Sequence, residues 1–171
     1  MNGLTLSAQQ TKNYGRITWV VVVLAGLLVG TTDILAAYTS FYIKTGKNPI
    51  APVSKFIASG VLGRPAMKGG AEMIALGLLF HYIIAFIWTI FFFWLYKRWE
   101  LMSKNWIVTG FIYGVFIYFM MSQVVVPLSN TPSVPKGNIG NKIISALILI
   151  TMIGLPLAYI AKRVTRKQAT D

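Results

Sequence analysis

One carboxylate and one imidazole are conspicuous in this sequence because each interrupts a long apolar run. Asp33 lies ten residues before the end of the run Ile17–Ile43, and His81, the only histidine, lies ten residues after the start of the run Ala71–Tyr96. At ~1.5 Å rise per residue, two antiparallel helices would place both side chains roughly 15 Å from the same end. Such a pair can share a proton or hold a ligand, because each charge offsets the cost of burying the other.

Further polar side chains fall at the corresponding end of the third and fourth apolar runs. Ionisable residues inside a membrane are functional by default, so we expect these side chains to line one ligand or proton site. The predicted site consists of Asp33, His81, Tyr118, Ser122, Asn141 and Lys142. Two interpretations of the Asp33–His81 pair stay open: a centre of proton or ligand chemistry, or a structural clasp between helices. Lys142 or Arg64 could equally be the partner of Asp33.

Residue types for catalysis and for metal binding are scarce. The chain has no cysteine, one histidine and four carboxylate side chains, none of them paired within an apolar run. A metal site is therefore not expected, and no cofactor is predicted. Nucleophile-elbow and phosphate-binding glycine motifs are also missing from the sequence. The residues favour a protein that is not an enzyme.

The composition excludes a soluble domain. Hydrophobic residues make up 56% of the 171 residues, charged residues only 12%, and the mean hydropathy is +0.65. A soluble chain of this length could not hide so much apolar surface. We therefore predict an all-α membrane protein with a four-helix transmembrane bundle over 17–161, between an N-terminal tail (1–16) and a basic C-terminal tail (162–171). A membrane span needs about 20 apolar residues, and the spans are expected at 17–43, 71–96, 106–127 and 139–161.

A shorter helix is predicted at 52–62, between the first and second spans. Pro52 suits a first turn, Gly63 suits the position after a helix, and Pro65 prevents continuation. One side of this helix is apolar and carries Val53, Phe56, Ile57 and Val61. The pattern is typical of a helix lying in the membrane interface.

The charge distribution indicates an orientation. The net charge is +12, and nine basic residues adjoin the apolar runs on the side of the termini, against seven on the other side. We expect both termini in the cytoplasm, the lipid bilayer as a partner, and no nucleic-acid binding, because no basic domain lies outside the spans. The aromatic side chains of the run Phe91–Trp94 are interpreted as facing lipid.

Small residues recur at helical spacing within the spans. Gly26 and Gly30 form a GxxxG pattern, as do Gly110 and Gly114, and Gly77 shares a face with His81. These glycines predict close helix packing. Asp33 shares the face of Gly26 and Gly30, so it should point into the bundle. Because polar residues concentrate in the outer half of the spans, we expect a polar pocket open to the outside above an apolar floor.

The order of these motifs resembles that of a family of small, functionally uncharacterised, four-helix bacterial integral membrane proteins. The stretches that carry the resemblance are GTTD (30–33), ASGVLG (58–63), GLLFH (77–81), GFIYG (110–114) and VVVPLS (124–129). The resemblance implies four helices in a bacterial inner membrane, and it carries no activity.

Two functions follow as hypotheses. The first is an accessory or interaction subunit that packs against other membrane helices, in a partner protein or in a homodimer. The second is a proton-linked transporter, or a membrane protein that binds a small molecule or lipid, with Asp33 and His81 at its centre. Four helices are few for alternating access, so the second hypothesis also expects a homodimer.

Overall fold

A computed structural model describes residues 19–99, 101–132 and 138–167 of the chain. The predicted tail 1–16 lies outside the described residues, as does the end of the predicted C-terminal tail. Every regular element in the described ranges is helical. Four helices are long and apolar enough to cross a membrane: Trp19–Thr45, Ala71–Arg98, Trp106–Leu128 and Ile139–Thr165. The predicted all-α architecture with four long apolar helices is therefore confirmed, with bounds that differ by a few residues.

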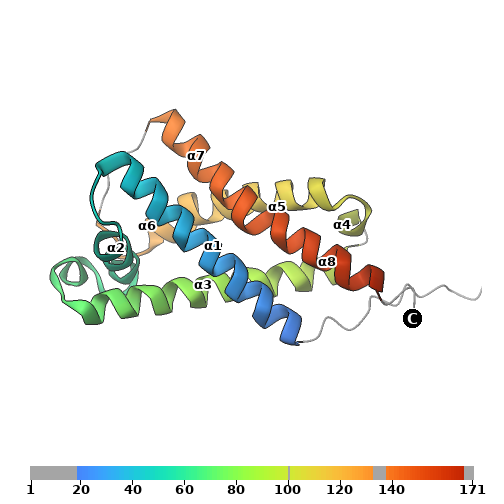
Figure 1. Cartoon of the computed structure of the whole chain (residues 1–171), viewed down its shortest axis with the longest axis horizontal. Helices are drawn as coiled ribbons and strands as arrows, with labels where there is room; N and C mark the ends of the chain where they lie inside the picture. The colour runs from blue at the N-terminus through green and yellow to red at the C-terminus, as the bar shows by residue number, and fades with distance from the viewer. Residues whose placement is uncertain (1–18, 100, 133–137, 168–171) are drawn as a thin grey trace, which may run out of the picture.

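The long helices define two ends of the molecule (Figure 1). Helices α1 (Trp19–Thr45) and α8 (Leu155–Lys167) have their terminal sides at one end, where the short α4 (Leu101–Lys104) also lies. We call this the termini end. Helix α2 (Ile50–Leu62) lies at the opposite end, which we call the α2 end. Helix α3 (Ala71–Arg98) packs along α1 and runs between the two ends.

Helix α2 confirms the predicted short helix between the first and second spans. Figure 1 shows it nearly end-on, so its axis crosses the direction of the long helices. Gly63 follows it with a positive φ of 71°, the left-handed conformation that glycine adopts without strain. The side that faces the protein carries small residues: Ser54, Ala58 and Ser59 are fully buried, whereas Val61 is exposed.

Helix α2 is held by its small side. An ideal Cβ built on Gly77 of α3 would lie 1.9 Å from the Ser54 carbonyl oxygen, so the two backbones touch. On α1, the Tyr38 hydroxyl lies 2.8 Å from the Ser54 hydroxyl, within hydrogen-bond distance. The backbone N–H of Asn130 donates to the Gly60 carbonyl at 3.0 Å. Three separate segments thus fix α2 to the bundle.

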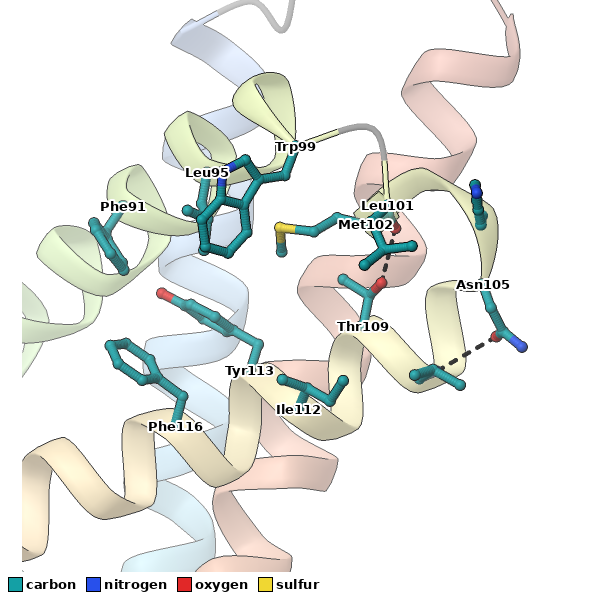
Figure 2. Close-up of a pocket in the computed structure, with 12 residues that line it drawn as sticks. Phe91, Leu95, Trp99, Leu101, Met102, Asn105, Thr109, Ile112, Tyr113 and Phe116 are labelled. Carbon is teal, nitrogen blue, oxygen red and sulfur yellow. Dashed lines mark hydrogen bonds between the residues drawn. The ribbon is translucent and has the colours of Figure 1, made fainter.

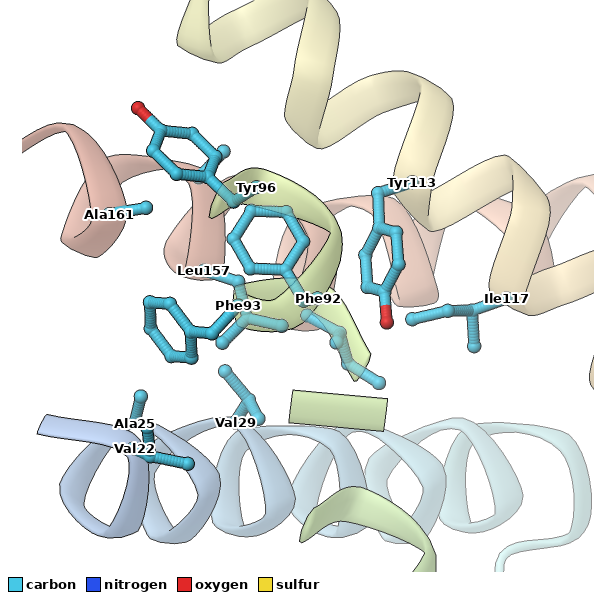
Figure 3. Packing of buried hydrophobic residues seen from close by; sticks show 12 residues of the cluster. Val22, Ala25, Val29, Phe92, Phe93, Tyr96, Tyr113, Ile117, Leu157 and Ala161 are labelled. Atoms are coloured by element: carbon cyan, nitrogen blue, oxygen red, sulfur yellow. The ribbon is translucent and has the colours of Figure 1, made fainter. Parts of the chain in front are cut away.

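The hydrophobic core lies toward the termini end (Figure 3). Phe92, Tyr96 and Leu157 are almost fully buried there, together with Tyr113 and Ile117 of α5 (Trp106–Met120). This packed cluster occupies the position of the expected apolar floor. It also corrects the interpretation of the aromatic run, because Phe92 and Phe93 of that run belong to the core and do not face lipid.

Two spans contain π-helical segments that the sequence did not predict. The third span continues from α5 through η2 (Met121–Val125) into α6 (Val126–Leu128). The fourth runs from α7 (Ile139–Leu149) through η3 (Ile150–Gly154) into α8. The Thr32 hydroxyl of α1 donates to the Met152 carbonyl within η3 at 3.2 Å. A π segment widens the helix turn, so it changes which side chains and carbonyls face the neighbouring helices.

Helix α5 meets the fourth span through glycine. An ideal Cβ on Gly154 would lie 2.1 Å from the Gly110 carbonyl oxygen, and one on Gly114 would lie 2.5 Å from the Ile150 Cα. No larger residue fits these positions without moving a backbone. Gly26 and Gly30 of α1 face the aromatic rings of Phe86 and Tyr82 on α3 instead.

The contact between α2 and α3 can be tested by adding one methyl group. Gly77→Ala is expected to lower the free energy of unfolding by about 1–3 kcal/mol, because its Cβ has no space beside the Ser54 carbonyl. The measurement is an unfolding titration in mixed detergent micelles. Gly60→Ala is the matched control, because the nearest atoms to its Cβ are 3.7 Å away. The packing would be wrong if both variants had the same stability.

Candidate functional site

His81 joins the two spans that the sequence predicted it to join. The side chain is 9% exposed, and its Nε2 lies 2.8 Å from the Gly30 carbonyl oxygen on α1. A carbonyl oxygen only accepts, so Nε2 carries the hydrogen and donates. One residue further along α3, the Tyr82 hydroxyl lies 2.8 Å from the Thr31 hydroxyl. These two contacts connect α1 to α3 near the middle of both helices.

Asp33 lies one helical turn from the carbonyl that His81 binds, and it is half-buried. The carboxylate lies near the His81 imidazole. It accepts no hydrogen bond and forms no ion pair in the part of the chain that the structure describes. The structure therefore brings the two predicted residues near each other, but the one hydrogen bond shown for the imidazole goes to the backbone of the neighbouring helix.

The alternative partners of Asp33 lie elsewhere. Arg64 is exposed in η1 (Arg64–Lys68), and Lys142 is exposed on α7. Neither forms an ion pair with Asp33. Tyr118 on α5 and Ser122 in η2 are half-buried, and no hydrogen bond within the described ranges joins either of them to Asp33 or His81. The six predicted site residues are thus not joined by hydrogen bonds into one site.

Asn141 lines a groove on another face of α1, which we call the α1–α7 groove. It has a volume of about 670 Å³ and lies toward the α2 end. Thr32, Ala36 and Ser40 of α1 line it at steps of four residues. The Ser40 hydroxyl and the Asn141 side-chain amide have no hydrogen-bond partner among the described residues. The remaining lining residues are Leu35, Thr39, Ile43, Lys44, Ile144, Ile148 and Met152.

The sequence carried a partial signal for this groove. The sequence predicts a polar pocket in this half of the spans, on the Asp33 face of α1. The groove lies instead along the face of Thr32 and Ala36, because α7 is the neighbour there. Which face of α1 meets α7 depends on the arrangement of all four spans, and the sequence of α1 alone does not contain it.

A second cavity, which we call the α3–α5 groove, was missed entirely (Figure 2). It has a volume of about 520 Å³ and lies at the termini end. Its walls are apolar and partly aromatic, and Phe91 belongs to them. The twelve lining residues are Phe91, Leu95, Trp99, Leu101, Met102, Lys104, Asn105, Val108, Thr109, Ile112, Tyr113 and Phe116. The aromatic run was the only feature of the sequence that could have indicated this groove. Large side chains that face lipid explain such a run equally well.

Comparison with known proteins adds no assignment. No protein family, curated protein or solved structure matches the chain. The resemblance noted from the sequence motifs therefore stays a hypothesis, and the functional conclusion depends on the geometry above.

The bond between His81 and Gly30 predicts a measurable contribution to stability. His81→Phe keeps an aromatic ring but removes the donor, so we expect the free energy of unfolding to fall by about 0.6–1.7 kcal/mol, the range of hydrogen bonds between membrane helices. Thr151→Val is the matched control, because the Thr151 hydroxyl is exposed and bonds only to carbonyls of its own helix. Equal stability of the two variants would show that the bond does not hold the helices together.

Proposed function

We propose that this protein is a non-enzymatic, multi-pass membrane protein that acts as an accessory or interaction subunit by binding a partner transmembrane helix in the α1–α7 groove. One observation carries the proposal: the groove combines small side chains with two groups, Ser40 and Asn141, that form no side-chain hydrogen bond within the part of the chain that the structure describes. Both features are those that membrane helices use to associate.

The lining favours a helix over lipid. Small residues at steps of four let two helix backbones approach closely, and Thr32, Ala36 and Ser40 form such a row. An amide that contacts only hydrocarbon loses the hydrogen bonds that it makes in water, which costs free energy. A partner helix can supply those bonds to Asn141, whereas an acyl chain cannot.

We further propose a bacterial inner membrane as the setting, with both termini in the cytoplasm. The full sequence supports this orientation, because nine basic residues adjoin the spans on the side of the termini against seven on the other side. Cytoplasmic loops carry an excess of lysine and arginine, and tryptophan is enriched at the interfaces. Trp19, Trp94 and Trp99, all more than half exposed, gather at the same end.

The proposed partner can be captured by site-specific crosslinking. The chain has no cysteine, so Ser40→Cys introduces a single thiol in the groove that can carry a photoreactive maleimide in native membranes. We expect an adduct heavier than the 19.0 kDa chain. An adduct of twice this mass identifies a second copy, and any other mass identifies a different protein.

Leu79→Cys is the matched control for this capture. Leu79 is 53% exposed on α3 and does not line the groove. We expect no adduct from that position. Equal adducts at both positions would indicate random collision, and no adduct at either would contradict an interaction subunit.

A second candidate function is a proton-linked transporter, or a binder of a small molecule or lipid, centred on Asp33 and His81. It is supported by the half-buried carboxylate, which lies near the imidazole and accepts no hydrogen bond in the described ranges. The core at the termini end would have to open during transport, because Phe92, Tyr96 and Leu157 close that side.

Proton flux into liposomes tests the second candidate. With an imposed pH gradient and a trapped pH-sensitive dye, a transporter that uses the pair is expected to lose its flux in Asp33→Asn, because an amide does not exchange protons in this range. Thr151→Val should conduct like the unaltered protein. If the unaltered protein conducts no better than empty liposomes, or if Asp33→Asn retains the flux, proton-linked transport at this pair is excluded.

A further inference from the structure

The α3–α5 groove opens sideways, toward the region that lipid would occupy around the spans. Ile112 and Val108 on its α5 wall are 60% and 50% exposed. Phe91 and Leu95 of α3 stand opposite, as Figure 2 shows. Its volume of about 520 Å³ falls within the range of roughly 300–1,000 Å³ of ligand sites in proteins. A molecule from the bilayer can therefore enter it laterally without any movement of the helices.

The walls present no free polar group to an occupant. The Tyr113 hydroxyl donates to the Trp88 carbonyl at 2.6 Å, and the Thr109 hydroxyl donates to the Met102 carbonyl at 2.8 Å. With both hydroxyls satisfied by backbone, the walls offer only hydrocarbon and aromatic surface. Such a surface suits an acyl chain and excludes a polar solute, which would lose its hydrogen bonds to water.

The end of the groove at the termini end carries hydrogen-bond donors. The Lys104 ammonium has no acceptor or ion pair among the described residues. The Asn105 side-chain oxygen accepts from the backbone N–H groups of Ile107 and Val108, at 3.0 and 3.4 Å. Its amide NH₂ group is left to donate outward.

The charge at this end is positive. Lys97 and Arg98 are the last two residues of α3, directly before Trp99 of the groove. Glu100 is the one acidic residue in the sequence between Lys97 and Lys104. Glu100 itself lies outside the described residues. Three basic residues against one acid attract an anion, and the free donors match the oxygen atoms of a phosphate.

We propose that the α3–α5 groove binds one anionic phospholipid of the surrounding bilayer. An acyl chain lies between α3 and α5, and the headgroup phosphate meets Lys104 and Asn105. The bulky walls argue against a partner helix here: Phe91, Tyr113 and Phe116 keep backbones apart, whereas helix association favours small residues. This site is independent of the α1–α7 groove and of the function proposed for it.

Native mass spectrometry of the full-length protein in detergent tests the proposal. The probes are dioleoyl phosphatidylglycerol and dioleoyl phosphatidylcholine, which differ only in their headgroups. We expect one phosphatidylglycerol per chain to be retained in preference to phosphatidylcholine. Lys104→Gln is expected to weaken phosphatidylglycerol binding about fivefold, the effect of one basic residue near a charged membrane surface, and to leave phosphatidylcholine unchanged.

A second variant separates the groove from its charge. Ile112→Trp fills the groove from an exposed position and should lower retention of both lipids at least tenfold; Val108→Trp does the same if Ile112→Trp fails to fold. Lys68→Gln and Leu79→Trp are the matched controls, because both positions are exposed and lie away from this groove. The controls should retain lipid like the unaltered protein.

Three results would overturn the proposal. Equal retention of the two lipids by the unaltered protein would show that the groove does not select an anionic headgroup. Equal loss in Lys104→Gln and Lys68→Gln would reduce the effect to general attraction by a basic protein. Retention unchanged in Ile112→Trp would place the lipid elsewhere. Glycerol phosphate in excess is expected not to displace the lipid, and displacement would indicate a site for free phosphate instead.

Discussion

Close backbone contact at a few glycines is the constraint on which the rest of this structure depends. Gly77 lets α2 press its backbone on α3, and Gly110, Gly114 and Gly154 bring α5 against the fourth span. Within lipid there is no hydrophobic driving force for helices to associate. Close packing at small residues therefore has to supply much of the free energy of association. These contacts set which helices are neighbours, and the remaining features follow from that pairing.

The pairing produces a bundle that is closed at one end and open in two grooves. Large side chains such as Phe92 and Leu157 fill the core toward the termini end. Aromatic residues hold α3 and α5 apart there, which leaves the α3–α5 groove. Toward the α2 end, α1 and α7 leave a groove whose lining combines large apolar residues with a row of small residues on α1 and a few polar side chains. The two grooves differ in lining, so they are proposed to take different occupants: a lipid and a helix.

The two members of the Asp33–His81 pair differ in their contacts. His81 donates its Nε2 hydrogen to the Gly30 carbonyl, as a residue that clasps two helices together would. Asp33 accepts no hydrogen bond in the described ranges, and its side chain lies near the imidazole. The contact with Gly30 uses only one imidazole nitrogen, so the proposed proton chemistry concerns the other nitrogen and the Asp33 carboxyl group.

The sequence by itself determined the elements of this protein. A span must be long and apolar to cross hydrocarbon, so the runs around Asp33 and His81 defined their helices, and Gly63 marked the end of α2 because few other residues adopt its positive φ. It also predicted one depth for Asp33 and His81 from the constant helical rise, and the structure sets His81 against Gly30, one helical turn from Asp33. Only the tertiary structure decided the π segments and both grooves. A π turn at Ile150–Gly154 depends on contacts with α1 and α5, and a groove depends on how far two helices diverge. The contacts around a π turn and the separation of two helices both involve more than one segment. The periodicity within one segment therefore does not reveal them.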